Sequence, residues 1–446
     1  MDDSSRPTAP HSKERVSYFY NLQASTESYG EGHPMKPARL GLTHELVIGY
    51  GLHNYMNIYT PWPASTTQIE AFHSTDYVDA LKRVTPNNYD KMAASIKRFG
   101  LGEDDCPVFS DMWDYFRMSC GGSIMAANYL GSGASDMAIN WMGGLHHAKK
   151  SVASGFCYTN DIVLGILELL RYYQRVLYID LDVHHGDGVQ DAFYGSNRVM
   201  TLSIHAYDGA FFPGTGSLDE SGIGRGKNYA VNVPLQMGID DASYHWIFKE
   251  VARNVIDKFQ PSAIVLQCGA DSLAGDRLGS FNVSIKGHGE CVRFIKSFGI
   301  PTMVLGGGGY TIRNVARCWA YETSVCCGVT VPNELPETVS YDYYGPDFVL
   351  HPNLTSPDRY SPNTRASLEK IRHRIVEQLR HVESAPSVQI HQIPPSFAQF
   401  NHLDGEWAVD FREDVQPDHR LRAEEFPVHR WKNSKTVDDN EFYDPF

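Results

Sequence analysis

The sequence contains no apolar run long enough to cross a membrane. Its 446 residues include no stretch of 18 or more apolar residues, and residues 1–7 lack the charged and then apolar pattern of a signal peptide. None of the eight cysteines belongs to a C-x-x-C pair, and several lie in apolar stretches such as 265–268. These features are typical of reduced thiols. We therefore expect a soluble intracellular protein with no membrane partner.

Positive charge is also scarce. The chain has 39 Lys and Arg against 53 Asp and Glu, a formal net charge of -14. This balance argues against direct nucleic-acid binding and is compatible with cationic protein substrates such as lysine-rich tails. No dense Lys and Arg cluster marks a nuclear localisation signal, and no internal repeat is present. The length is compatible with one large domain plus extensions.

Short apolar runs alternate with helical patterns along the chain. The runs 16–20, 137–140, 176–179, 199–204, 263–268 and 302–305 predict strands. Helices are expected from Thr43 as N-cap, across 69–83, from 121 to 130, and at 161–173, 242–259 and 368–379. This alternation predicts βαβ units and a parallel sheet, in which ligands bind at the carboxyl ends of the strands.

The strand at 176–179 leads directly into Asp180, Asp182, His184 and His185. Because side chains alternate along a strand, Asp180, Asp182 and His184 are expected on one face and His185 on the other. Carboxylates and an imidazole are costly to bury without a cation, so the stretch predicts a metal site. The alternative is a solvated acidic loop.

Asp271 ends an apolar strand as Asp182 does, which makes it the expected third metal ligand. The alternative is a helix N-cap. Three protein ligands with an open position are the pattern of catalytic zinc, although this carboxylate-rich set also suits Fe(II) or Mn(II).

The adjacent His146 and His147 follow a strand end and a Gly-Gly pair. Such histidines are usually surface residues or satisfied core residues. Asp180 and Asp187 are not needed for the metal, however, and each could accept a hydrogen bond from a histidine Nδ1. Two His–Asp pairs beside a metal would supply a general base and a general acid.

A glycine run at 306–309 precedes Tyr310. It could be a loop that needs positive φ or a phosphate cradle, but it lacks the P-loop lysine and does not match G-x-G-x-x-G. Glycines would also let the backbone approach a metal and direct the Tyr310 hydroxyl at a developing oxyanion. Phe156 and Phe212 are core residues by default, and facing each other they would form a slot for an unbranched side chain.

These motifs together resemble the class I zinc-dependent histone deacetylases, in family order and spacing. The matching segments are 143–149, 153–158, 178–188, 212–216, 269–273 and 305–310. The resemblance covers residues 16–385, and segments 32–37 and 385–391 look closest to the subtype that works in nuclear corepressor complexes. It implies a single α/β domain around an eight-stranded parallel sheet flanked by helices, similar to arginase. Residues 1–15 are expected to be disordered, and 386–446 to form an extension that packs as a strap or folds on a partner.

The resemblance also implies a role for each site residue. One zinc ion would sit on Asp182, His184 and Asp271, and the enzyme would hydrolyse N-acetyl-lysine in histones or other proteins. His147 would be the main general base, assisted by His146, and Tyr310 would stabilise the oxyanion. Gly155, Phe156, His185, Phe212 and Leu278 would line the lysine channel, with Asp105 or Asp104 at its rim and Arg39 at an internal acetate exit.

Further ligands follow only from the resemblance. One potassium ion would bind at Asp180, Asp182, His184, Ser203 and Ile204, and a second at Phe193, Ser196, Val199 and Tyr229. Lys36, Arg277 and Arg313 match basic residues that clamp an inositol phosphate in the corepressor-bound subtype, whereas Ser28 replaces a histidine and Ala206 a lysine of the family. A nuclear location is implied, with cytoplasmic presence also expected.

Other functions stay open at this point. An acetylpolyamine deacetylase would keep the chemistry with a narrower mouth, and a non-catalytic corepressor scaffold would keep only the fold. The related ureohydrolases bind two manganese ions through further aspartates, but the corresponding positions here are Gly186 and Leu273. A single metal is therefore expected.

Overall fold

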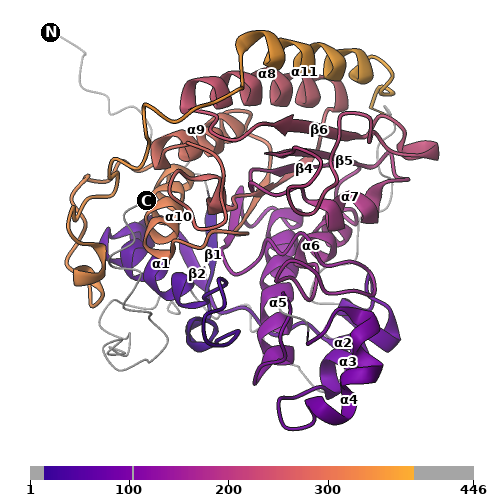
Figure 1. Cartoon of the computed structure of the whole chain (residues 1–446), viewed down its shortest axis with the longest axis vertical. Coiled ribbons are helices and arrows are strands. Elements are labelled where there is room, and N and C mark those ends of the chain that lie inside the picture. The colour runs from indigo at the N-terminus through magenta and orange to yellow at the C-terminus, as the bar shows by residue number, and fades with distance from the viewer. Residues whose placement is uncertain (1–14, 103–104, 386–446) are drawn as a thin grey trace, which may run out of the picture.

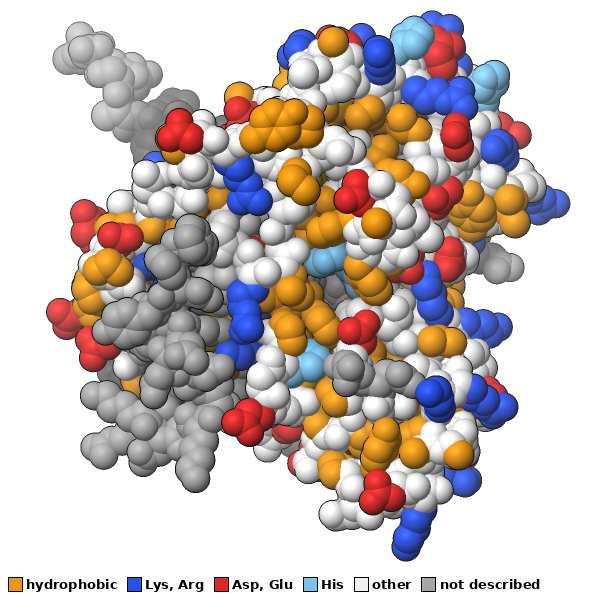
Figure 2. Space-filling model, viewed as in Figure 1, with side chains coloured by type: hydrophobic (Ala, Val, Ile, Leu, Met, Phe, Trp, Pro, Cys, Tyr) orange, Lys and Arg blue, Asp and Glu red, His pale blue; other side chains and the backbone are white. Residues whose placement is uncertain are grey.

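The computed structural model describes residues 15–102 and 105–385. The predicted disordered N-terminus, apart from Arg15, and the extension at 386–446 lie outside the described residues. Among the described residues, no helix combines the length and the apolar character that a membrane crossing requires. On the face shown in Figure 2, lysine and arginine side chains are interspersed with acidic and hydrophobic ones.

One parallel sheet of eight strands forms the centre of the fold, in the order β2-β1-β3-β8-β7-β4-β5-β6 (Figure 1). This confirms the predicted fold class. The strands are β1 (Val16–Phe19), β2 (Asn57–Tyr59), β3 (Met137–Asn140), β4 (Val176–Asp180), β5 (Val199–Ala206), β6 (Ala230–Leu235), β7 (Ala263–Gln267) and β8 (Thr302–Leu305). The strand patterns did not predict β2 or β6. Both are edge strands, β2 with three residues and β6 with Pro234, which an edge strand tolerates.

Helices cover both faces of the sheet. Residues of β4 alternate between the two layers: Val176 and Tyr178 pack with one helical layer, and Leu177 and Ile179 with the other. The first layer contains α5 (Met112–Gly131), α6 (Asp161–Leu169) and α7 (Asp187–Phe193). The second contains α1 (Ala38–Gly49), α8 (Asp241–Phe259), α9 (Ile285–Lys296), α10 (Ile312–Cys327) and α11 (Arg365–Leu379). Three shorter helices lie near the lower end of α5 in Figure 1: α2 (Thr66–Ile69), α3 (Thr75–Arg83) and α4 (Tyr89–Ile96).

Several predicted helix boundaries were wrong. The helix expected to start after Thr43 begins at Ala38, and the Thr43 hydroxyl instead donates 2.8 Å to the Arg39 carbonyl within the helix. The span 69–83 is not one helix, because α2 and α3 are separate. The helix expected from 121 starts at Met112, and the one expected to reach 173 ends at Leu169, whereas α8 confirms the span 242–259 to within one residue.

The four central strands β3, β8, β7 and β4 end level with one another. Asn140 pairs with Leu305, Leu305 with Gln267, and Gln267 with Asp180, and each is the last residue of its strand. The loops that follow these strands therefore start from one edge of the sheet. These loops carry the polar clusters of the sequence, as the parallel arrangement predicted.

Behind this edge, a buried ion pair joins α9 to α10. His288 Nδ1 and the Glu322 carboxylate make a direct hydrogen bond, and both side chains are fully buried. His288 Nε2 also donates 3.1 Å to the Gly269 carbonyl, in the loop after β7. Removing one member of such a pair leaves a buried charge without a partner.

We predict that His288→Ala lowers the free energy of unfolding by about 3–5 kcal/mol, measured by urea denaturation. The control is Arg83→Ala, which breaks the Arg83–Asp79 pair, whose side chains are 69% and 46% exposed. Its effect should be about 1 kcal/mol or less. Equal unfolding midpoints for the two variants would contradict the role assigned to the buried pair.

Candidate active site

Asp182, His184 and Asp271 meet at the carboxyl edge of the sheet. Asp182 and His184 follow β4, and Asp271 lies in the short 3-10 helix η5 (Ala270–Ser272) after β7. His184 Nδ1 is 3.0 Å from an Asp182 oxygen and 3.1 Å from an Asp271 oxygen. Both carboxylates are fully buried, and ligand atoms of all three residues lie within 4.8 Å of one another. The structure thus brings together the three residues predicted to bind the metal.

The expected alternation along β4 does not extend past the strand. β4 ends at Asp180, and the residues after it are not in extended strand geometry. The Asp180 carboxylate accepts hydrogen bonds from the Tyr178 hydroxyl at 2.6 Å and from His146 at 2.8 Å. Asp180 Oδ1 also accepts the Asp182 backbone amide at 3.1 Å, and His146 lies 2.8 Å from an Asp180 oxygen and 3.8 Å from an Asp182 oxygen, so both carboxylates face the same histidine. That Asp180 shares a face with both Asp182 and His184 stays a prediction. Its prediction as a histidine partner fits these contacts.

The charge of this cluster fits a divalent cation. Burial disfavours the charged form of His184 and by itself would lower its pKa. The hydrogen bonds that His184 makes with Asp182 and Asp271, and the negative charges of these residues, outweigh burial and raise the pKa of His184 to about 10. Burial and the charge of Asp182 raise the pKa of Asp271 to about 7. The two buried carboxylates thus raise the proton affinity of this group, and a bound cation would balance the same negative charge. One imidazole nitrogen and two carboxylates suit zinc with an open coordination position.

Two glycines allow the chain to pass close to these ligands. A Cβ at Gly269 would overlap the Asp182 carboxylate, and one at Gly308 would overlap the Asp271 carboxylate. The Gly308 backbone N–H also donates 2.8 Å to Asp182 Oδ2. Glycine is therefore required at both positions by the space the metal ligands occupy.

A second group of metal-ligand residue types, His288, Cys318 and Glu322, is also fully buried. Both ring nitrogens of His288 already have protein partners, Nδ1 the Glu322 carboxylate and Nε2 the Gly269 carbonyl. The first group therefore fits a metal ion better than the second.

The two adjacent histidines each pair with an aspartate, as predicted. His146 Nδ1 is 2.8 Å from Asp180 Oδ2, and His147 Nδ1 is 2.7 Å from Asp187 Oδ1. Burial opposes protonation of both rings, yet the charges of Asp180 and Asp182 raise the pKa of His146 to about 9. Burial, with the positive charge of His146, lowers the pKa of His147 to about 4. One imidazole is thus suited to carry a proton and the other to accept one.

Further residues hold these histidines in place. The buried Asp161 accepts the backbone amides of Gly144 at 3.0 Å and Leu145 at 2.9 Å, which fixes the loop before His146. Lys149 bridges Asp187 at 2.6 Å and Asp191 at 2.7 Å.

The glycine run before Tyr310 is held at successive peptide groups. Arg39, which is buried, donates 2.6 Å to the Gly307 carbonyl and 2.8 Å to the Gly309 carbonyl. The Gly308 carbonyl accepts the Ala270 amide at 2.9 Å. The run therefore binds neighbouring loops and places Tyr310 beside them, which favours the structural role over a phosphate cradle.

Aromatic side chains lie around the cluster. The Phe212 ring is 4.9 Å from the His147 ring and 6.0 Å from that of His184, and its side chain is 39% exposed. Phe156 makes an edge contact with Tyr310 at 5.6 Å. A Cβ at Gly155 would meet both His147 and Phe212. Leu278 is partly buried. These positions agree with an apolar passage to the metal group.

The predicted place of His185 in the channel wall gains no support from its contacts. His185 is buried, with Nδ1 2.8 Å from the Thr215 hydroxyl and Nε2 3.1 Å from Gln190 Oε1. It therefore anchors the loop that contains Thr215. At the rim, Asp105 is exposed, and Asp104 lies outside the described residues.

The residues predicted to bind potassium ions and an inositol phosphate lie in several parts of the fold. Asp180 and Ser203 pair across β4 and β5, with Ile204 next in β5. Phe193 ends α7, its carbonyl accepts the Ser196 amide, and the Tyr229 carbonyl accepts an amide of β5. Of the predicted inositol-phosphate residues, Arg277 is exposed, and Lys36 and Arg313 are half-buried.

One site residue was missed from the sequence. Gln267, the last residue of β7, donates 3.0 Å to the Asp182 carboxylate and accepts the Gly269 amide at 2.8 Å. Gln267 could have been found from the sequence because, like Asp180, it is a polar residue at the end of an apolar strand.

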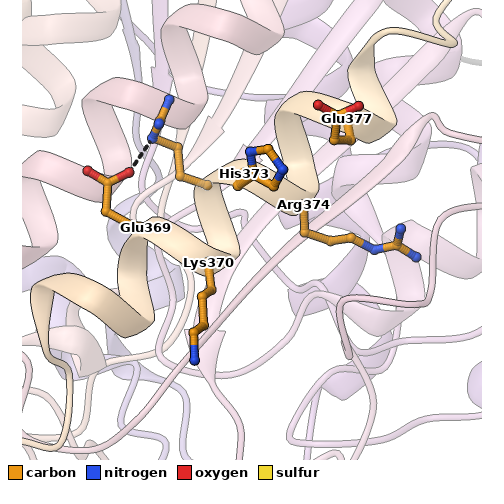
Figure 3. A pocket seen from close by; sticks show the side chains of 6 residues that line it. Glu369, Lys370, His373, Arg374 and Glu377 are labelled. Atoms are coloured by element: carbon orange, nitrogen blue, oxygen red, sulfur yellow. Dashed lines mark hydrogen bonds and ion pairs between the residues drawn. The ribbon is translucent and has the colours of Figure 1, made fainter.

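A hollow elsewhere on the surface is unrelated to this group. Its lining residues Glu369, Lys370, Arg372, His373, Arg374 and Glu377 all belong to α11 (Figure 3). The Glu369–Arg372 hydrogen bond of 2.8 Å within it joins neighbouring turns of one helix.

Comparison with known proteins agrees with this geometry. Residues 33–326 match the histone deacetylase domain. The chain belongs to the histone deacetylase family. Histone deacetylase B of Dictyostelium discoideum is 58% identical over 386 residues, 86% of this chain and 91% of that protein. Histone deacetylase 1 of Homo sapiens is 54% identical over 382 residues, 86% of this chain and 78% of that protein.

Histone deacetylase HDAC1 of Drosophila melanogaster is 51% identical over 434 residues, 97% of this chain and 80% of that protein. The resemblance to the class I histone deacetylases is thus confirmed. Asp182, His184 and Asp271 all lie within the matched histone deacetylase domain.

We predict that Gly308→Ala weakens zinc retention by about 10- to 100-fold, because a Cβ there displaces the Asp271 carboxylate. Zinc content after dialysis against graded chelator measures this loss. Gly195→Ala is the matched control, because a Cβ at Gly195 meets nothing within 4 Å. Normal zinc retention by Gly308→Ala would show that the close approach does not limit the site.

Proposed function

We propose that this histone deacetylase hydrolyses N6-acetyl-lysine in histones and other proteins and releases acetate and lysine. The single observation that carries the proposal is that Asp182, His184 and Asp271 lie together beside two His–Asp pairs. This arrangement suits metal-assisted amide hydrolysis.

The protein would hold one zinc ion on Asp182, His184 and Asp271. When bound, zinc supplies Lewis-acid chemistry to the acetyl carbonyl and to a water molecule. Burial and the hydrogen bond from the Gly308 amide to Asp182 hold the carboxylate oxygens in place before the substrate arrives.

His147 acts as the general base. Its lowered pKa keeps it neutral at pH 7, and Asp187 on its Nδ1 leaves Nε2 to accept a proton from water. His146 carries the higher pKa and lies 3.9 Å away between ring centres, so it supports the charge that develops and shuttles a proton. The amine of lysine leaves after receiving a proton from this pair.

Tyr310 donates its hydroxyl hydrogen bond to the oxyanion. Burial, with the charge of Asp271, raises its pKa well above the usual range, so it stays a neutral donor. It carries no negative charge that would oppose the oxyanion.

Phe156 and Phe212 with Gly155 and Leu278 form the passage for the lysine methylenes, and Asp105 binds the substrate backbone at the rim. A small cavity bordered by Tyr18, Leu40, Trp141 and Met142 lies next to α1, which carries Arg39. Arg39 itself hydrogen-bonds the Gly307 and Gly309 carbonyls, and its part in an acetate exit is proposed from the family resemblance.

We further propose structural potassium ions at the two predicted sets, a nuclear location, and assembly with corepressors. The basic residues Lys36, Arg277 and Arg313 support inositol-phosphate binding. We propose in addition that the protein is also present in the cytoplasm.

Zinc removal tests the proposed function. Chelation followed by dialysis should abolish hydrolysis of an acetylated histone peptide, and zinc should restore it. Full activity of the metal-free protein would overturn the proposal. A higher rate on free acetylpolyamine than on peptide would favour polyamines as substrates, and no turnover of either by the zinc-loaded protein would favour a non-catalytic scaffold.

Tyr310→Phe should lower kcat by about 10²-fold or more with the KM for the acetylated peptide little changed, because the lost bond forms mainly in the transition state. Steady-state kinetics measure it. Tyr360→Phe is the matched control, since Tyr360 is 78% exposed, and it should leave kcat unchanged. A near-normal kcat for Tyr310→Phe would remove this residue from the mechanism.

A further inference from the structure

The carboxylate of Asp276 joins the loop after β7 to the turn that carries Tyr310. Its Oδ2 accepts the Tyr310 backbone N–H at 2.7 Å and the Thr311 N–H at 3.1 Å. Its Oδ1 accepts the Leu278 N–H at 3.0 Å. The Thr311 hydroxyl adds a bond of 3.0 Å to the Gly275 carbonyl. One side chain thus binds the backbone of two residues already placed at the site, Tyr310 and Leu278.

The Tyr310 side chain is buried in the hydrophobic core, and its position is set by this packing together with its backbone. Among the described residues, no protein group hydrogen-bonds its hydroxyl, which is therefore available to a ligand, and Phe156 gives only an edge contact at 5.6 Å. On the N-terminal side lies the glycine run, which has no side chains to fix it. Arg39 and Asp182 hold that run up to Gly309. The next peptide N–H, that of Tyr310 itself, is bound by Asp276.

From these contacts we propose that Asp276 is a positioning residue that sets the Tyr310 hydroxyl for oxyanion stabilisation. The inference rests on the proposed function, because it gives Asp276 no contact with the substrate. Charge-assisted bonds from three N–H groups to one carboxylate are strong and directional. An asparagine has one acceptor oxygen and would direct its own N–H groups at some of these donors, so the isosteric change disrupts the arrangement.

A purely structural role is the alternative. Asp276 would then stabilise the loop without affecting Tyr310 in particular, and its loss would lower stability or zinc content together with activity. Coupling between Asp276 and Tyr310 separates the two roles, because a general loss of stability is independent of the Tyr310 hydroxyl.

The experiment is a double-mutant cycle on the zinc-loaded full chain, with an acetylated histone peptide as substrate. Asp276→Asn should lower kcat roughly tenfold or more in the wild-type background, since a small misplacement of a catalytic group is costly. In the Tyr310→Phe background the same change should lower kcat less than about twofold. Zinc content should equal that of the wild type.

Asp241→Asn provides the control. Asp241 likewise binds the backbone of a distant residue, accepting the Ser284 N–H at 2.7 Å, but it joins α8 to α9. It should lower the thermal midpoint with kcat unchanged in both backgrounds. If Asp276→Asn does not fold, Thr311→Val, which removes only the bond to Gly275, tests the same cycle and should show a smaller loss that vanishes with Tyr310→Phe.

Binding provides a readout without turnover. A hydroxamate of an unbranched acid presents a carbonyl oxygen to the metal and to Tyr310, so Asp276→Asn should weaken its binding severalfold in the wild-type background and hardly at all with Tyr310→Phe. Equal losses in both backgrounds, in kcat and in hydroxamate binding, would overturn the inference while leaving the proposed function intact. An inactive zinc-loaded wild type would instead overturn the proposed function.

Discussion

Two carboxylates buried within hydrogen-bonding distance of one imidazole are the constraint on which this site depends. Asp182 and Asp271 have no exposed surface, and the protein carries no cationic Lys or Arg hydrogen-bonded to either among the described contacts. Negative charge in such a place is costly unless a cation balances it. The surrounding amides and the Gln267 amide group hold the oxygens in place, and the glycines at 269 and 308 leave them room.

The same accumulation of charge divides the two neighbouring histidines. His146 lies between Asp180 and Asp182, whose charges raise its pKa, with an Asp182 oxygen 3.8 Å from its Nε2. His147 lies next to that positive ring and has its own aspartate, which Lys149 shares. The pKa values of two identical side chains thus shift in opposite directions because of the charges around them.

Much of this could be predicted from the sequence. The parallel sheet and the grouping of Asp182, His184 and Asp271 followed from apolar strands that end in polar residues. The number of strands came from the family resemblance, because β2 is short and β6 contains a proline. The partners of His185 could not be predicted, because its hydrogen bonds to Thr215 and Gln190 depend on how the loops after β4 and β5 fold. Asp276 gave no signal because its role lies in contacts with backbone groups.

The order of the strands has a consequence for biosynthesis. Among the described residues β8 is the last strand along the chain, yet it lies between β3 and β7 in the middle of the sheet. Until residues 302–305 leave the ribosome, β3 and β7 each present an unpaired hydrogen-bonding edge, and such edges promote association with other chains. The two halves of the sheet, β2-β1-β3 and β7-β4-β5-β6, can therefore be joined only after most of the chain has been translated.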